Sequence, residues 1–284
     1  MTAAQFAHLP LLPPYLEPIH HQFTKGVNFA SAGGAVLHQH NNGAMDLPTQ
    51  VIHFKTVVKT LKQEIGDAEA EKVLSRAVYL FSNGGNDYFS FSTNNRNATP
   101  SQQAQFVGMV IGNLTSILKE LYGLGVRKIA FQNVGPLGCT PTMKFVLDSP
   151  HASECVEPPL ALATLHNKAL AEALKNLETK LPGFKYSIFD YYHELLDRIK
   201  NPSKYGFENG ETACCGGGKY RAFYCGGGGS GTHPFDVCKD PNEYVWFDGA
   251  HTTEKTNNQL AHLIWSGEPP VTGPYNLQQL FEHA

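Results

Sequence analysis

An aspartate and a histidine three residues apart, Asp248 and His251, have types and spacing suited to acid–base chemistry. They follow an apolar segment, EYVWF, and precede a predicted helix. On such a turn the carboxylate can hold the imidazole Nδ1–H, which leaves Nε2 free as a general base toward a hydroxyl nucleophile. The alternative is structural: Asp248 caps the helix, and His251 is one of 13 histidines on a surface. The spacing alone does not decide between the two.

Two groups of small residues have the chemistry to stabilise an oxyanion. In Gly84–Asp87 (GGND), the Asn86 side chain can present an amide N–H to a developing negative charge, and the glycines let a carbonyl approach the backbone. In Ser31–Gly34 (SAGG), the small residues follow an apolar segment, and a backbone N–H there can serve the same charge. The alternatives are a tight turn for the first group and a packing or flexible turn for the second.

The Gly-rich segment Gly226–Gly231 (GGGGSG) formally fits the dinucleotide pattern G-x-G-x-x-G. Dinucleotide binding requires a preceding strand and a following helix, whereas here Cys225 precedes and Thr-His-Pro follows. We therefore interpret this segment as a loop. Neither a nucleotide cofactor nor any other cofactor is predicted.

Six cysteines suggest an exported protein with disulfide bonds. Four of them lie in the Gly-rich region, and adjacent Cys214 and Cys215 do not give the C-x2-C spacing of a zinc site. Unpaired thiols are the other alternative. We expect three bridges, namely Cys139–Cys155, Cys214–Cys225 and Cys215–Cys238.

Two glycosylation sequons, at Asn97 and Asn113, agree with export. The first residues, MTAAQFAHLP, lack the basic region of a signal peptide. On this evidence either the protein is not exported or the start has been lost.

The candidate acid–base and oxyanion residues lie on predicted turns of a parallel sheet. Apolar runs predict strands at residues 77–82, 126–132 and 185–190, and helical periodicity predicts helices between and after them. Strands alternating with helices indicate parallel crossover units with helices on both faces. Ligands bind outside the carboxyl ends of such strands, where the turns SAGGA, NGGND and DGAH are expected.

Length and composition favour one domain over residues 1–284, with a Cys- and Gly-rich loop at about 201–242. The chain has 284 residues, of which 42% are hydrophobic and 17% charged, and its net charge is −3. Without a cluster of Lys and Arg, nucleic acid and acidic lipid surfaces are poor candidate partners. No apolar run approaches the roughly 18 residues that span a bilayer.

Five segments in this order and spacing resemble plant GDSL esterase/lipases of the SGNH hydrolase superfamily: GVNFASAGG, LFSNGGNDYF, FQNVGPLGC, KYGFENGETACCG and WFDGAHTTEKTNNQLA. The resemblance runs from about Pro10 to Gly267. It implies a three-layer α/β/α fold, secretion, and action on carboxylic ester or lipid small molecules, with acyl transfer in some members. Carried over by position, it implies oxyanion donors at Gly33 and Asn86, an orienting acid at Asp248 and a base at His251.

One block of the family is absent. The family opens with a strand followed by G-D-S-L, which carries the nucleophilic serine, but this sequence contains no Gly-Asp-Ser. The resemblance therefore implies a sheet without its first, central strand and a chain inactive as it stands. Ser31, Ser82 and Ser230 are poor substitutes by position. The alternatives are an N-terminally incomplete hydrolase, a non-catalytic descendant that binds an acyl ligand or a protein, and an acyltransferase.

Overall fold

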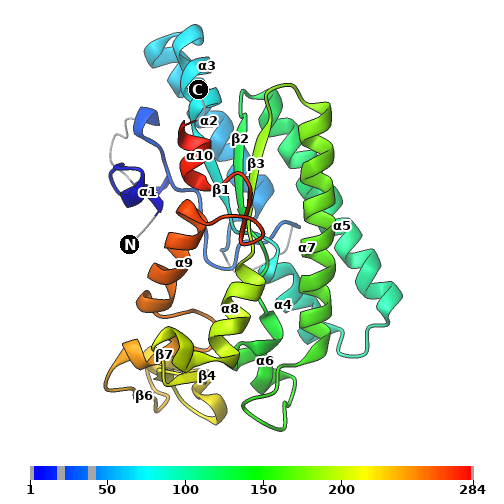
Figure 1. The fold of residues 1–284 in the computed structure, drawn as a ribbon, viewed down its shortest axis with the longest axis vertical. Helices are drawn as coiled ribbons and strands as arrows, with labels where there is room; N and C mark the ends of the chain where they lie inside the picture. Colours follow the sequence, from blue (N-terminus) through cyan, green and yellow to red (C-terminus); the bar gives the residue numbers. More distant parts are fainter. Residues whose placement is uncertain (1–2, 18–22, 38–42, 283–284) are drawn as a thin grey trace.

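The computed structural model is centred on a mainly parallel sheet (Figure 1), and it describes residues 3–17, 23–37 and 43–282. Strands β1 (Val78–Phe81), β2 (Lys128–Gln132) and β3 (Lys185–Phe189) run parallel in that order. Strand β8 (Thr272–Pro274) pairs antiparallel with β3. The three strands predicted from apolar runs are confirmed, with small shifts at their ends.

Helices cross between the parallel strands, as parallel pairing requires. Helices α4 (Gly85–Asn94) and α5 (Pro100–Gly123) connect β1 to β2, and α7 (Glu157–Lys180) connects β2 to β3. Helix α5 begins at a capping box between Thr99 and Gln102, which explains why Thr99-Pro100 predicts its start. The other α-helices of the described residues are α1 (Ala3–Phe6), α2 (Leu47–Ile65), α3 (Asp67–Arg76), α6 (Pro141–Val146), α8 (Tyr191–Lys200), α9 (Glu254–Ser266) and α10 (Leu277–Glu282).

Helices cover both faces of the sheet because side chains of β2 alternate between two hydrophobic clusters. Ile129 and Phe131 join the large cluster that α2, α5 and α7 complete. Ala130 faces the opposite way and joins a smaller cluster with α9 and α10. Figure 1 shows α7 on one side of the strands and α9 and α10 on the other. The three-layer α/β/α class predicted from the sequence is therefore confirmed.

The two edges of the sheet differ. Strand β8 covers β3, whereas β1 pairs only with β2 within the described residues. Leu80 of β1 is 52% exposed, while Ile129 and Ala130 of β2 are fully buried. The apolar segment at 26–30 does not cover this edge, since its one bridge joins Asn28 to Pro14. In this part of the chain the outer edge of β1 has unpaired backbone groups.

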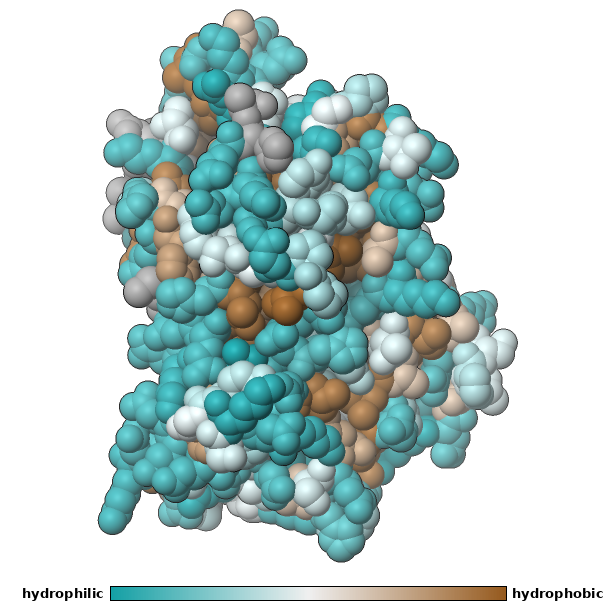
Figure 2. Space-filling view, in the orientation of Figure 1, coloured by the Kyte–Doolittle hydropathy of each residue, from teal (hydrophilic) through white to brown (hydrophobic). Residues whose placement is uncertain are grey.

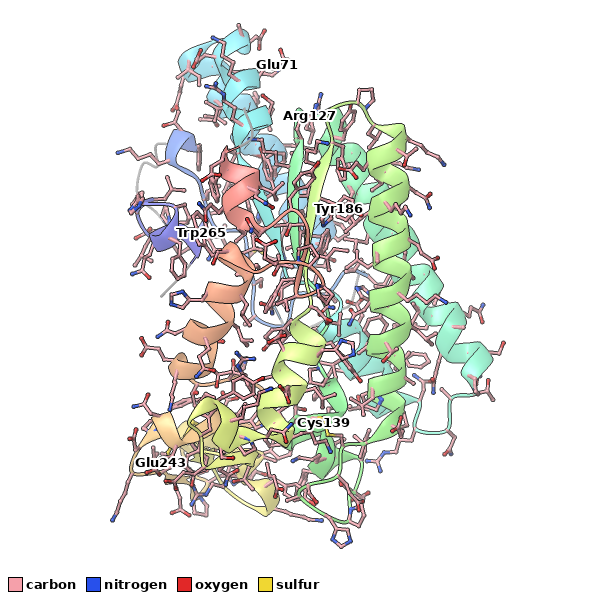
Figure 3. The ribbon with its side chains drawn as sticks, viewed as in Figure 1. Glu71, Arg127, Cys139, Tyr186, Glu243 and Trp265 are labelled. Atoms are coloured by element: carbon pink, nitrogen blue, oxygen red, sulfur yellow. A yellow bond between two sulfur atoms is a disulfide. The ribbon has the colours of Figure 1, made fainter. Side chains whose placement is uncertain are left out.

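The Cys- and Gly-rich segment contains short strands and is therefore more ordered than the loop predicted there. Strand β4 (Asn209–Ala213) pairs parallel with β7 (Tyr244–Trp246), and β5 (Cys215–Gly216) pairs antiparallel with β6 (Asp236–Val237). In Figure 3, Glu243 of this region lies at the opposite end of the molecule from Arg127, which precedes β2. The segment therefore sits beyond the carboxyl ends of the parallel strands.

The disulfides confirm one predicted bridge and correct two. Cys139–Cys155 is present, but the others are Cys214–Cys238 and Cys215–Cys225, so the predicted partners of Cys214 and Cys215 were wrong. The reason lies in the strand pairing. The Cys238 N–H donates to the Cys214 carbonyl at 2.8 Å, which makes these two residues neighbours across β5 and β6. Successive residues of a strand point in opposite directions, so Cys215 faces away and meets Cys225.

The visible surface is mostly hydrophilic, with small and separate hydrophobic patches (Figure 2). Among the helices of the described residues, none has both the length and the apolar character needed to cross a membrane.

Candidate active site

Asp248 and His251 form a hydrogen-bonded pair on the turn after β7. The His251 Nδ1 lies 2.9 Å from both carboxylate oxygens of Asp248. The same carboxylate accepts from the backbone N–H groups of Ala250 and His251, at 2.9 and 2.8 Å. Helix α9 is capped separately by Thr253, so the cap alternative for Asp248 is wrong. The His251 side chain is 80% exposed, which leaves Nε2 accessible.

The pair is electrostatically coupled. The hydrogen bond that the His251 imidazole donates to Asp248 raises the pKa of His251 above its usual value, because it stabilises the imidazolium more than burial disfavours it. Burial alone would raise the pKa of Asp248, but hydrogen bonds from the His251 side chain and from two backbone N–H groups outweigh it and leave the pKa below its usual value. Asp248 therefore stays ionised near neutral pH, which suits a residue that orients a base.

The Cys-rich segment holds the turn that carries this pair. The N–H groups of Cys214 and Cys215 donate to the carbonyls of Trp246 and Phe247, at 2.9 and 2.7 Å. Gly249 packs so closely that a Cβ there would lie 2.0 Å from the Ala222 carbonyl oxygen. Only glycine fits this contact, so the D-G-A-H sequence is tied to the Cys-rich segment by packing as well as by hydrogen bonds.

The second candidate group lies at the carboxyl end of β1. Gly84 has φ of +104°, a left-handed conformation that favours glycine, and α4 begins at the next residue. The predicted NGGND turn thus becomes the first turn of a helix. The Asn86 Nδ2 donates to the Gly34 carbonyl at 2.8 Å, which brings the two predicted oxyanion segments together. An amide nitrogen has two hydrogens, so Asn86 retains a second donor for a ligand.

Asp87 also links the start of α4 to the segment that follows Gly34. Its buried carboxylate accepts from the N–H groups of Val36 and Leu37, at 2.9 and 3.0 Å. No described residue accepts a hydrogen bond from the Gly33 N–H. The oxyanion role of Gly33 stays a prediction.

Two residues of α7 support the same region, and the sequence analysis missed both. His166 is fully buried, and its Nδ1 lies 2.6 Å from the Tyr88 hydroxyl of α4. A Cβ on Gly84 would lie 3.0 Å from its ring, and burial lowers the pKa of His166 to about 4, so the ring is neutral at pH 7. Asn167 binds both the N–H and the carbonyl of Val134, at 2.9 and 2.8 Å. The available signal was a histidine on the apolar stripe of α7, between Leu162 and Leu170.

A second pair with the same spacing was also missed. His193 Nδ1 lies 2.7 Å from Asp190 Oδ2, and the His193 N–H donates to Asp190 Oδ1 at 3.3 Å. Asp190 caps α8 directly after β3. A search for every D-x-x-H in the sequence finds this pair and also Asp148 and His151, whose Asp148 carboxylate accepts from Arg96 instead.

The structure thus brings the predicted residues into two groups, Gly33 and Asn86 in one and Asp248 and His251 in the other. No hydrogen bond between the described residues joins them. That the four converge on one pocket stays a prediction. The described residues contain no cluster of three or more His, Cys, Asp or Glu that could hold a metal ion.

The three-layer α/β/α fold and the Asp–His pair beyond its strands are the features that the resemblance to GDSL esterase/lipases implies. The chain belongs to the GDSL-like lipase/acylhydrolase family, whose sequence model matches residues 2–264. It is 44% identical to GDSL esterase/lipase 4 of Arabidopsis thaliana, over 98% of this chain and 76% of that protein. It is 43% identical to GDSL lipase of Tanacetum cinerariifolium, over 98% and 73%. It is also 36% identical to inactive GDSL esterase/lipase-like protein 25 of Arabidopsis thaliana, over 98% and 62%.

Proposed function

We propose that this chain supplies the acid–base pair and the oxyanion donors of a carboxylic ester or lipid hydrolase, and that residues 1–284 alone do not turn over esters. The observation that carries the proposal is the His251 imidazole, held through Nδ1 by Asp248 with its other nitrogen accessible. Membership of the lipase/acylhydrolase family supports the reaction class.

The residues have separate roles in this reaction. His251 takes the proton from the attacking hydroxyl and returns it to the departing alcohol, while Asp248 fixes the imidazole tautomer and stabilises the imidazolium. Asn86 and the Gly33 N–H donate to the carbonyl oxygen as it becomes negative. His251 is more exposed than a base in a closed site, which agrees with a site that lacks a neighbouring nucleophile.

The serines of this chain do not meet the requirements of the nucleophile. Ser31 Oγ accepts from the Met45 N–H at 3.0 Å, and Ser82 Oγ accepts from Gln132 at 3.3 Å. Ser230 Oγ is 2.6 Å from the Thr232 hydroxyl. Within the described residues, no serine forms a hydrogen bond with the His251 side chain. A nucleophile must lie within hydrogen-bond reach of its base, so these contacts support an inactive chain.

The open edge of β1 supports the same proposal. A strand at the edge of a sheet presents unpaired backbone N–H and C=O groups to which a further strand can add. The exposed Leu80 and the unpaired outer edge indicate room for a further strand, which is where the family's strand with Gly-Asp-Ser would belong. Without it we expect marginal folding and a tendency to aggregate.

The second candidate function is non-catalytic binding of an acyl ligand or a protein. The observation that favours it is the 36% identity to a relative whose name describes it as inactive. Reading the transcript upstream of Met1 separates the two candidates. An in-frame Gly-Asp-Ser block supports the hydrolase, and a stop codon or promoter supports the binding protein.

Export through the secretory pathway is part of the proposal. Three disulfides leave no free cysteine, which indicates an oxidising compartment. Asn97 and Asn113 are exposed, as glycosylation requires. Mass spectrometry of the protein from its natural source checks this: glycosylated peptides and three bridges support export, and six free thiols contradict it.

Hydrolysis of short p-nitrophenyl esters tests the proposed reaction. Residues 1–284 alone should show no activity above background. The same chain preceded by a family-type segment with Gly-Asp-Ser should be more soluble and active. Addition of an alcohol acceptor distinguishes acyl transfer from hydrolysis by the product formed. Failure of the added segment to produce turnover in a soluble protein would contradict the hydrolase.

A further inference from the structure

A groove between α4 and α5 adjoins the oxyanion segments. It consists of two adjoining hollows, of about 480 and 300 Å³, that share Phe91, Asn94, Asn95 and Phe106. The volume of the larger hollow is in the range of ligand sites in proteins. The residues of the proposed reaction do not include any of these four, so the groove is a separate feature of the fold.

The smaller hollow reaches the oxyanion segments. It is lined by Leu37 and Asp87, and the Asp87 carboxylate accepts from the Leu37 N–H at 3.0 Å. Asp87 follows Asn86, whose amide donates to Gly34. A substrate whose carbonyl oxygen lies at Asn86 and Gly33 can therefore extend into this groove. The departing alcohol must lie near His251, because it takes its proton from that residue. The acyl group is the other part of the ester, and it is the part that can occupy the groove.

The floor of the groove is aromatic. The rings of Phe91 and Phe106 stack with centroids 4.3 Å apart and an interplanar angle of 22°. Met109, which is 48% exposed, extends the apolar surface along α5. Such a surface favours an aromatic ring, because aromatic pairs gain from stacked or edge contacts beyond simple burial.

The rim of the groove is polar and has unused acceptors. Asn94 and Asn95 direct their amide N–H groups to Ser90 Oγ and the Phe91 carbonyl, at 3.4 and 3.0 Å. Within the described residues their side-chain oxygens accept no hydrogen bond. An alkyl chain would leave these oxygens unpaired as it excludes water, whereas a hydroxyl group can donate to them.

The larger hollow is also lined by a charged residue, Arg96. Its guanidinium is held in place by Asp148, at 3.2 Å, and by the Val146 carbonyl. The Asp148 carboxylate offsets the charge of the guanidinium. An uncharged polar end of the ligand therefore fits this place better than a long apolar tail.

We propose that the groove between α4 and α5 binds a hydroxylated aromatic acyl group in preference to a long alkyl chain. The assignment of the groove to the acyl side of the substrate rests on the proposed function. The binding of an ester in the groove does not rest on it. Residues 1–284 contain no Gly-Asp-Ser, so a bound ester should remain intact and its binding can be measured without turnover.

Equilibrium dialysis with three methyl esters tests the preference. The sample is unglycosylated residues 1–284, because Asn97 lines the groove, and it is a soluble fraction whose fold is confirmed by circular dichroism. Methyl 4-hydroxycinnamate should bind, methyl cinnamate should bind about tenfold more weakly, and methyl octanoate more weakly still. Replacing both Asn94 and Asn95 by Leu should remove the difference between the first two esters. Equal or tighter binding of methyl octanoate, or no binding of any ester at millimolar concentration, would overturn the proposal.

A blocking variant locates the ligand. Asn94→Trp fills the groove from an exposed position and should weaken binding of methyl 4-hydroxycinnamate about tenfold or more. Asn113→Trp, at an exposed asparagine of α5 that does not line the groove, is the matched control and should bind as the parent does. Full retention of binding in Asn94→Trp would place the ligand elsewhere and overturn the groove.

The two proposals fail in different ways. If the ester binds in the groove but the chain with the added Gly-Asp-Ser segment shows no turnover, the hydrolase is wrong and the groove remains. If that chain is active but Asn94→Trp changes neither ester binding nor the preference among acyl groups, the groove is wrong and the hydrolase remains.

Discussion

Two pairs in this molecule share the D-x-x-H spacing and almost the same hydrogen bonds, but they belong to different surroundings. Asp190 caps α8, and its geometry is explained by the needs of a helix N-terminus. Asp248 caps no helix, and its turn is held by the Cys-rich segment. Both histidines are exposed, at 73% and 80%. Spacing and local geometry therefore do not identify a base, and the surrounding structure must be considered.

The largest effect should distinguish the two histidines. In the protein with the added Gly-Asp-Ser segment, His251→Ala should lower kcat by about 10⁴-fold or more, because it removes the general base. His193→Ala is the matched control and should leave kcat within about threefold, since its partner Asp190 caps α8 and we assign that pair no part in the reaction. Hydrolysis of p-nitrophenyl esters measures both. A large loss in His193→Ala would reverse the assignment.

A smaller fall in kcat is expected when the oxyanion donor Asn86 is removed, which tests whether it acts in the same reaction as His251. Asn86→Ala should lower kcat by about 10²- to 10³-fold, the usual cost of one oxyanion donor. Asn113→Ala, on the exposed face of α5, controls for a general effect of losing an amide. Unchanged kcat in Asn86→Ala would remove the link between this turn and the base.

Removing one disulfide should affect the two pairs unequally. Replacing Cys214 and Cys238 by Ser should cost about 3 kcal/mol of stability in the chain-entropy model. It should also shift the imidazole signals of His251 in NMR spectra, because Cys214 holds β7 next to that turn. His193 is held by α8 and should change less. Equal shifts at both histidines would show that the Cys-rich segment does not specifically support Asp248.

The smallest effect concerns protonation. The Asp248 hydrogen bond raises the pKa of His251, so Asp248→Asn should lower that pKa in an NMR titration. The raised pKa stabilises the folded state below the unfolded pKa of histidine, and this contribution is lost as pH rises through the folded pKa. Accordingly, Asp248→Asn should weaken stability more at acidic than at alkaline pH. A His251 pKa that does not respond to Asp248→Asn would contradict the coupling.

The sequence predicts the central elements because their signals are local. The three parallel strands are apolar runs, and Thr99-Pro100 has the residue types of a helix start. β8 escapes prediction because Thr-Gly-Pro looks like a turn, and only pairing with the edge of β3 makes it a strand. β4 escapes for the same reason, since NGETA has no apolar pattern.

In the candidate site, too, the contacts between residues near in sequence could be predicted, and those between distant residues could not. Asp248 and His251 are recognisable because three residues on one turn bring them together. The contacts of Asn86 with Gly34 and of Tyr88 with His166 join residues far apart in the sequence. The disulfide partners of Cys215, in β5, and of Cys214, directly before it, depend on the direction in which each side chain points. The number of residues between cysteines does not contain that information.

Labelling with a serine-reactive fluorophosphonate tests the central claim most directly, because it reports the nucleophile without reference to any ester. Intact mass and peptide mapping should show no adduct on residues 1–284. They should show one adduct on the serine of Gly-Asp-Ser when the added segment is present, and none when His251→Ala is combined with that segment. An adduct on Ser31, or on any other serine within residues 1–284, would contradict the account.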